Sequence, residues 1–456
     1  ERNCLRVAAG IKISETGIPL KPAQTFFSPE VVMVYSDEGF GKMSRRFHKL
    51  YREHLINPRF ANKPRPIVLN SWESMVFNFD ESKFIAFTEH AKGLGIDTIV
   101  MDDGWFGHRD NDDSSLGDWF VDRKKFPNGL KNVIDACKLN GMRFGIWFEP
   151  EAISEDSELY AAHPEWAISS LGREHHLIRQ QCVLDFSKKE VVDHIFKCMK
   201  KILDAYEISY IKWDMNRSLT DVCDAETYYL YTQGVYSLYE RISDAYPDVV
   251  IEGCAGGGGR FDPSVLYYSP FIWTSDNTDA SCRARIQYGT SYCYPLQSMS
   301  NHVSASPCLQ TGRRFPMDTR INVASLGCLG YELRPMDLTE EERKLIATKN
   351  GEYRKNRDLI LNGDLYRLLD PFTNNGFAEL IVSENKESAY FVYMKFLHQS
   401  WLPNEIIRLQ GLDENACYRI EELNKVYFAR ELMYAGLCVD VPFGDYTSVA
   451  YKLTKV

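Results

Sequence analysis

The chain has 456 residues, of which 44% are hydrophobic and 25% are charged, the balance of an ordinary globular protein with room for two or three domains. Its formal net charge of -10 argues against binding to nucleic acid, because that binding depends on concentrated Lys and Arg. No run approaches 18 apolar residues, so we expect no membrane span. A polar or uncharged small-molecule partner fits this composition better.

The cysteines predict a reduced, cytoplasmic protein. The 12 cysteines are scattered, with no CxxC or CxxH spacing, and several lie in apolar runs, as Cys137 and Cys198 do. This use of cysteine as a small apolar residue predicts neither a disulfide framework nor a zinc site. The first ten residues lack the charged-then-apolar pattern of a signal peptide, but the chain begins at Glu1 rather than Met, so a longer polypeptide is left open.

Residues 1–65 predict the end of a preceding unit followed by a linker. A strand-like run occupies residues 30–36, and a helical pattern follows over residues 41–55. The segment closes with "NKPRP", whose two prolines are typical of a linker.

Residues 66–365 predict a (β/α)₈ barrel. Apolar runs of strand length alternate with helical patterns at 82–94, 129–140, 188–207 and 225–245. Eight such runs match the strand number of the barrel: 67–72, 98–105, 142–151, 182–187, 210–214, 249–255, 271–276 and 296–304. A doubly wound open sheet would show the same alternation, so the position of the polar residues has to separate the two folds.

Residues 366–456 predict a separate C-terminal domain, an antiparallel β-sandwich. Before this domain, Thr339 and Glu342 have the spacing of a capping box and open a long helix. Within the domain, strand-like runs such as "AELIVS" and "SAYFVYMKF" are broken by polar turns. We found no repeats and no low-complexity segments.

Polar residues gather at the ends of the predicted barrel strands. In a (β/α)₈ barrel the carboxyl ends of the strands meet at one mouth, where such enzymes carry out their chemistry. Carboxylates beside tryptophans suit cleavage of glycosidic bonds, in which one carboxylate attacks carbon and another protonates the leaving oxygen. These strand-end residues are Asn70, Trp72, Glu73, Asp102, Asp103, Trp147, Glu149, Glu151, Asp185, Lys212, Asp214, Glu252, Cys254, Ser275, Asp276 and Asp279.

Two other ligand classes have candidate residues at this mouth, a divalent cation and a phosphate group. Asp102 and Asp103 could hold a divalent cation, but they have no nearby His and neighbouring side chains on a strand point in opposite directions, so we expect no metal. The run "CAGGGGRFD" at 254–262 lacks the GK(S/T) ending of a phosphate loop. Its glycines indicate close backbone approach to a ligand, with a plain flexible turn as the alternative.

Five of these motifs together resemble glycoside hydrolase family 36, the large microbial α-galactosidases. The motifs are "MDDGWFG", "GIWFEPE", "KWDMNR", "CAGGGGRFD" and "WTSDNTDA", and the resemblance runs from about residue 20 to the end. It implies a retaining hydrolysis of terminal α-linked galactose, as in melibiose and raffinose, without a cofactor. It also implies that residues 1–65 are the remnant of an N-terminal β domain, and a homo-oligomer is a further expectation.

The resemblance assigns roles residue by residue. Asp214 corresponds to the nucleophile and Asp276 to the acid/base. Asp102 and Asp103 correspond to the pair that holds the 4- and 6-hydroxyls, Lys212 and Arg179 to hydroxyl-binding cations, Trp72 and Trp147 to aromatic walls, and Cys254 and Gly256 to the segment near the 2-hydroxyl.

These assignments agree with elementary geometry. Lys212 and Asp214 are two residues apart on a strand, so their side chains share one side and the cation would keep Asp214 ionised. Asp279 is an alternative candidate for the acid, but we expect it to cap the following helix or to orient its neighbours. Glu149, Glu151, Glu252 and Asp185 are expected to support the residues that contact the sugar.

Departures from the family pattern leave alternatives open. The chain has "CAGGGG" where "CASGGG" is usual, beside the 2-position of the sugar, and "PCLQTGR" where "PNHQTGR" is common. An α-N-acetylgalactosaminidase and a transglycosylase of the raffinose-synthase kind are therefore the rival enzymes. A non-catalytic carbohydrate-binding protein is the alternative from a different class.

Overall fold

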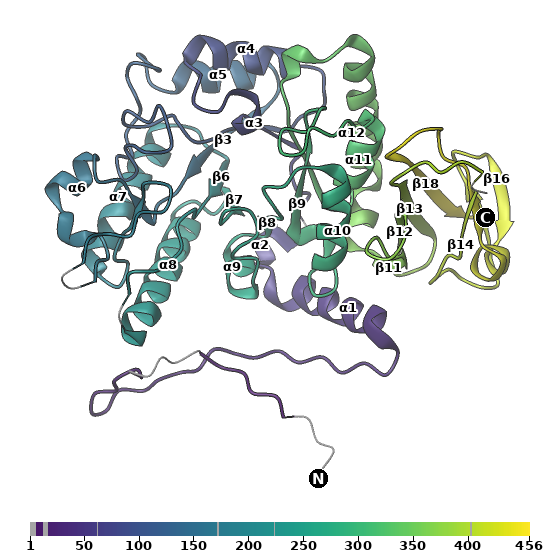
Figure 1. Ribbon diagram of the computed structural model, residues 1–456, viewed down its shortest axis with the longest axis horizontal. Coiled ribbons are helices and arrows are strands. Elements are labelled where there is room, and N and C mark those ends of the chain that lie inside the picture. The colour runs from purple at the N-terminus through teal and green to yellow at the C-terminus, as the bar shows by residue number, and fades with distance from the viewer. Residues whose placement is uncertain (1–5, 12–16, 62, 171–172, 223, 402–403) are drawn as a thin grey trace.

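The computed structural model describes residues 6–11, 17–61, 63–170, 173–222, 224–401 and 404–456. Its centre is a closed barrel of parallel strands, and this confirms the predicted (β/α)₈ fold (Figure 1). The strands are short and buried on both sides, as parallel strands covered by helices must be. In barrel order they are β1 (Val68–Asn70), β10 (Cys328–Glu332), β9 (Met299–Ser304), β8 (Phe271–Trp273), β7 (Val250–Gly253), β6 (Tyr210–Trp213), β3 (Arg143–Phe148) and β2 (Thr98–Met101).

One of the eight predicted barrel strands is wrong. The run 182–187 contributes only β5 (Cys182–Val183), which pairs antiparallel with β4 (Ala152–Ile153) in an excursion between β3 and β6. The barrel is closed instead by β10, which pairs with both β9 and β1. β10 was not predicted because Gly330 interrupts its apolar pattern. Glycine is required at this position, since a methyl group at Gly330 would overlap the ring of His302.

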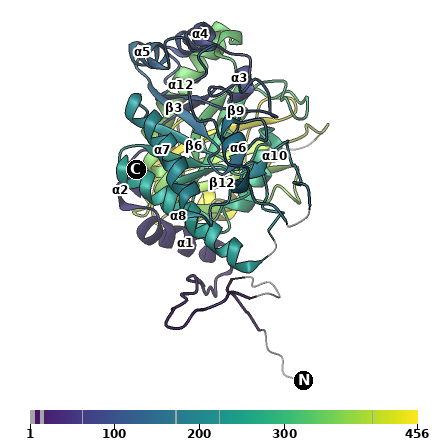
Figure 2. The ribbon, with the colours of Figure 1, turned by 90° about the vertical axis from the view of Figure 1, so that its left-hand side faces the viewer.

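The predicted helices surround the barrel, as Figures 1 and 2 show. The four predicted patterns correspond to α4 (Glu81–Ala91), α5 (Lys131–Leu139), α7 (Lys189–Ala205) and α8 (Ala225–Ala245). The other helices of the barrel region are α3 (Trp72–Met75), α6 (Glu158–Ala162), α9 (Pro263–Tyr268), α10 (Ala280–Thr290), α11 (Met317–Ala324) and α12 (Glu340–Asn362). Thr339 and Glu342 form the predicted capping box of α12, and Asp279 caps α10 as expected.

The segment before the barrel differs from its prediction. Residues 30–36 form no strand, because no neighbouring strand pairs with their backbone among the described residues, and their side chains are mostly exposed. The predicted helix is present as α1 (Gly39–Leu50), continued by a wider turn over Tyr51–Leu55 and followed by the short α2 (Pro58–Ala61). In Figure 1 the purple chain before α1 runs along the outside of the barrel helices.

The C-terminal region is antiparallel β structure, as predicted. Its six-stranded sheet has the order β11 (Asp364–Leu369), β12 (Gly376–Val382), β13 (Ser388–Lys395), β18 (Thr447–Lys455), β15 (Cys417–Ile420), β16 (Lys425–Phe428). Leu380 and Phe391 pack with residues of a two-stranded sheet, β14 (Glu405–Ile407) and β17 (Leu437–Val439). The alternate residues Ile381 and Val392 join the core of the barrel, so the sheet is covered on both faces. No helix in the described part of the chain is both long and apolar enough to cross a membrane.

Two glycines inside helices give a stability prediction. A methyl group at Gly234 in α8 would overlap the carbonyl oxygen of Phe186, whereas one at Gly351 in α12 would meet open space. We expect Gly351→Ala to stabilise the protein by about 0.5–1 kcal/mol, because alanine costs less backbone entropy in a helix. We expect Gly234→Ala to destabilise it by about 1–3 kcal/mol through overpacking. Urea unfolding of the two variants tests the difference, and equal midpoints would contradict the close approach of α8 to Phe186.

Candidate active site

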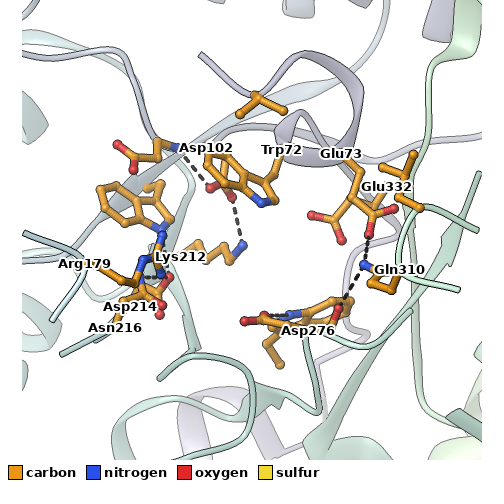
Figure 3. Close-up of a pocket in the computed structure, with 15 residues that line it drawn as sticks. Trp72, Glu73, Asp102, Arg179, Lys212, Asp214, Asn216, Asp276, Gln310 and Glu332 are labelled. Carbon is orange, nitrogen blue, oxygen red and sulfur yellow. Dashed lines mark hydrogen bonds and ion pairs between the residues drawn. The ribbon is translucent and has the colours of Figure 1, made fainter. Parts of the chain in front are cut away.

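A cavity of about 360 Å³ lies at the carboxyl ends of the barrel strands (Figure 3). Its walls come from residues at or after the carboxyl ends of seven of the barrel strands, which meet here because a closed parallel barrel brings all carboxyl ends to one mouth. The lining residues are Trp72, Glu73, Val76, Asp102, Asp103, Trp147, Arg179, Lys212, Asp214, Asn216, Trp273, Asp276, Leu309, Gln310 and Glu332.

The structure brings the predicted site residues together. Trp72, Asp102, Asp103, Trp147, Arg179, Lys212, Asp214 and Asp276 all line the cavity. The two others, Cys254 and Gly256, lie behind Asp214 instead: the Cys254 thiol hydrogen-bonds to its carboxylate, and the Gly256 amide lies 3.4 Å from its Oδ1. Their contact is therefore with the predicted nucleophile, and neither is among the residues that line the cavity.

Asp214 is buried and surrounded by donors. The Met215 amide donates to Oδ1 at 2.8 Å, while Asn216 Nδ2 and Trp147 Nε1 donate to Oδ2 at 2.9 and 3.2 Å. Burial alone would raise the pKa of Asp214, but the Lys212 ammonium and these hydrogen bonds outweigh it and hold the pKa below its ordinary value. Asp214 is therefore an ionised carboxylate at a buried position.

Lys212 and Arg109 neutralise the two adjacent aspartates. Lys212 Nζ lies 2.8 Å from Asp102 Oδ2, and Arg109 lies 2.8 Å from Asp103 Oδ2. Burial would lower the pKa of Lys212, but the carboxylate of Asp102 raises it well above its ordinary value, so Lys212 stays charged. Each of the adjacent aspartates thus has its own cation, consistent with side chains that point in different directions.

Asp276 lies across the cavity from Asp214 (Figure 3). Its Oδ1 accepts a hydrogen bond from Trp273 Nε1 at 2.9 Å. Gln310 donates both to the backbone oxygen of Asp276, at 3.2 Å, and to Glu73 Oε1, at 2.9 Å. Asp276 therefore has a fixed backbone and an indole partner, and no cation pairs with it among the described residues.

Glu332, Gln310 and Trp273 line the cavity although the sequence analysis gave them no role. Glu332 was missed because its strand, β10, was missed; a polar residue at the end of residues 328–332 is the signal that could have found it. Burial raises the pKa of Glu332 to about 8. Burial, and secondly the charge of Glu332, raise the pKa of Glu73 to about 7.

Arg179 reaches the cavity from the excursion between β3 and β6. Its backbone and that of Gln180 have left-handed φ values of 53° and 54°, which cost energy in residues with a side chain. The buried Arg217 holds this loop by donating from Nε to the Gln181 oxygen at 3.0 Å and by bonding the His176 oxygen. Arg217 belongs to the "KWDMNR" motif, so one motif supplies both Asp214 and the clamp on Arg179.

The four expected supporting carboxylates divide into three groups. Glu149 accepts hydrogen bonds from Asn216, which in turn contacts Asp214. Glu151 binds Arg260 and Tyr231, and Glu252 accepts from the Tyr210 hydroxyl at 2.7 Å, so these two stabilise the barrel wall below the cavity. Asp185 lies elsewhere: it accepts a hydrogen bond from Ser187 in the turn before α7.

The fold and site define a class: a (β/α)₈ barrel whose carboxyl-end mouth holds a cavity of carboxylates, cations and tryptophans, as in enzymes that act on sugars. Comparison with known families makes this specific. Residues 25–363 match the melibiase family, and residues 377–453 match the glycosyl hydrolase family 36 C-terminal domain. The chain belongs to glycoside hydrolase family 36.

Several relatives are α-galactosidases by name. The chain is 43% identical to alpha-galactosidase AgaA of Geobacillus stearothermophilus, covering 99% of this chain and 63% of that protein. It is 42% identical to the bifunctional alpha-galactosidase/sucrose kinase AgaSK of Mediterraneibacter gnavus, covering 49% of that protein. A crystal structure of an AgaA variant in complex with raffinose has a TM-score of 0.93, at 42% identity, and is covered over 62% of its chain and 96% of this one. The chain thus spans less than two thirds of the length of these relatives.

The raised pKa of Glu332 gives a pH prediction. The folded protein keeps this proton up to about pH 8, whereas the unfolded chain releases it near the ordinary value of 4.5, so stability falls as pH rises through that interval. We expect Glu332→Gln to flatten this fall, because the amide has no proton to lose. Urea unfolding at a series of pH values measures it, with Glu384→Gln in an exposed turn as the control. An unchanged slope in Glu332→Gln would contradict a buried, protonated Glu332.

Proposed function

We propose that the chain hydrolyses terminal α-linked galactose from galacto-oligosaccharides or glycoconjugates, with retention of configuration. One observation carries the proposal: Asp214, held ionised, and Asp276, without a cation, face each other across one cavity. The names of the relatives support the choice of α-galactosides, as do the raffinose and stachyose bound in crystal structures of AgaA variants.

In the proposed mechanism Asp214 is the nucleophile and Asp276 the general acid and base. The Asp214 carboxylate attacks the anomeric carbon while Asp276 gives its proton to the departing glycosidic oxygen, which forms a galactosyl-Asp214 ester and releases the alcohol. Asp276 then removes a proton from water, and the water oxygen attacks the same carbon and frees Asp214. Two displacements give net retention, and Asp276 carries the proton in both steps, so the reaction needs no cofactor.

The surrounding residues are proposed to bind the sugar. The ion-paired Asp102 and Asp103 accept hydrogen bonds from the 4- and 6-hydroxyls, and Lys212 and Arg179 donate to hydroxyl oxygens. Trp72 and Trp147 supply walls for the apolar faces of the ring. Trp147 is pinned by its bond to Asp214, and Trp72 packs edge-on against Phe77 with ring centroids 5.3 Å apart. Because these contacts are already formed, the site is preorganised.

Cys254 and Gly256 are proposed to lie near the 2-hydroxyl. Cys254 is 4% exposed and is hydrogen-bonded to Asp214. An acetamide beside the nucleophile would therefore have to fit against the packed Cys254 side chain. This supports galactose over N-acetylgalactosamine as the substrate.

Three further expectations stay predictions. They are the domain limits 1–65, 66–365 and 366–456, a homo-oligomeric assembly and a cytoplasmic location. The proposed chemistry depends on none of them. The proposal concerns the cavity and the groups that line it.

The choice of sugar is tested by two chromogenic substrates. We expect the aryl α-galactoside to be hydrolysed at least about tenfold faster than its N-acetyl counterpart, because a site that rejects one extra group by sterics typically discriminates by one to two orders of magnitude. Faster release from the N-acetyl substrate would assign the rival α-N-acetylgalactosaminidase activity. Product analysis with excess sucrose separates the transglycosylase, since transfer exceeding hydrolysis would replace the proposed reaction.

The nucleophile is tested by Asp214→Ala. We expect a loss of at least about 10⁴-fold in kcat, since the covalent step disappears, and partial recovery with azide, an anion small enough to attack in place of the carboxylate. Asp248→Ala, at a side chain that is 95% exposed, should keep full activity. A fluorinated galactosyl donor should label Asp214 covalently. If Asp214→Ala keeps its kcat and no label forms, Asp214 is not the nucleophile. If the wild type itself hydrolyses no galactoside, the carbohydrate-binding alternative replaces the enzyme.

A further inference from the structure

Three metal-ligand side chains meet on the excursion between β3 and β6, outside the cavity. Glu155 follows β4, Cys182 begins β5, and His175 lies in the connection between them. Each offers one ligand atom, a carboxylate oxygen, an imidazole nitrogen and a sulfur, and these atoms all lie within 4.8 Å of one another. Carboxylate, imidazole and thiolate are the three ligand types that zinc takes in proteins.

The backbone brings these residues together. Ile153 of β4 pairs with Cys182 of β5, so Glu155, two residues beyond Ile153, lies close to the Cys182 thiol. His175 Nδ1 lies 2.9 Å from Glu155 Oε1, and its ring packs edge-on against Tyr160. The imidazole and the carboxylate are thus already side by side, and the sulfur is beneath them.

The burial of the three side chains gives the site an inner wall and an opening. Cys182 is 2% exposed, the His175 side chain is 14% exposed and the Glu155 side chain is 46% exposed. A cation can enter from the Glu155 side. The exposed carboxylate can also move to close the remaining gap, since ligand atoms around one zinc ion lie about 3.5 Å apart.

We propose that Glu155, His175 and Cys182 bind one soft divalent cation of the zinc class, with a fourth position open to water. When the cation binds, the Cys182 S–H proton is released to solvent and a sulfur–metal bond forms. The hydrogen bond between His175 and Glu155 is exchanged for two metal bonds, and the proton that it contains moves to the other ring nitrogen of His175, so that the ligand is a neutral imidazole. Cysteine spacing predicts no zinc site, because these residues are separated in sequence and only the β4–β5 pairing assembles them.

The proposed site lies at both ends of the loop that carries Arg179. His175 precedes this arginine and Cys182 follows it, while Arg217 holds the intervening backbone at His176 and Gln181. A bound cation would therefore tether the loop at its two ends and restrict its opening. This consequence can be measured without the proposed activity, so failure of one proposal does not touch the other.

Direct binding is the first test. Equilibrium dialysis of the whole chain against Zn²⁺ should show one cation that is lost in Cys182→Ser, and Cd²⁺ should give a thiolate charge-transfer absorbance that the same variant lacks. His175→Asn should weaken binding at least about tenfold. Because His175 is partly exposed, this variant is expected to fold, and it tests the site even if the buried Cys182 variant misfolds. The control is Cys198→Ser, since Cys198 and His194 form a second thiol–imidazole pair. Loss of binding in Cys198→Ser with retention in the other two variants would overturn the site.

Trypsin is the second test, because the loop between His175 and Cys182 contains the exposed Arg179. We expect saturating Zn²⁺ to slow cleavage after Arg179 several-fold in the wild type and to have no effect in His175→Asn, as followed by mass spectrometry of the peptides. Equal cleavage with and without the cation in the wild type would overturn the tether.

Discussion

The rest of the site depends on the buried ion pair between the Lys212 ammonium and the Asp102 carboxylate. A charge inside a barrel is costly, and this one is retained because Asp102 lies 2.8 Å away and Asp214 is close enough to share its field. Removing one partner of a buried pair costs roughly 3–5 kcal/mol, because the other charge is left without compensation. Lys212 therefore links two carboxylates with different proposed tasks, one that binds the substrate and one that attacks it.

Strand geometry explains why the sequence predicted this group so well. Lys212 and Asp214 are two residues apart, so any strand through them puts both side chains on one side, and a parallel barrel brings their neighbours Asp102 and Asp276 to the same mouth. These inferences need only local period and strand direction. Whether Cys254 lines the cavity or lies behind Asp214 depends on packing, which no pattern encodes.

The two errors in the predicted barrel strands arise because strand pairing depends on the three-dimensional arrangement and not on local pattern. Residues 182–187 look like a barrel strand, yet their pairing partner is β4, which only the three-dimensional arrangement reveals. β10 looks unlike a strand because Gly330 makes room for His302. Because β10 and not residues 182–187 completes the barrel, the residues at the cavity differ from those predicted. Glu332 of β10 lines the cavity, and Asp185 does not. Arg179 lines it as predicted, from a loop that Arg217 holds.

The cavity also shows that burial alone does not decide the charge of a carboxyl group. Asp214 and Glu332 are equally enclosed, and burial raises the pKa of each. Asp214 has Lys212 and several hydrogen-bond donors, which reverse the shift, whereas Glu332 has weaker compensation and faces the repulsion of Asp102 and Asp276. Protons therefore gather on Glu332 and Glu73, at the Asp276 side of the cavity, and negative charge stays on Asp214. The ionised state of Asp214 is what the proposed double displacement requires, because its nucleophile must carry no proton when it attacks.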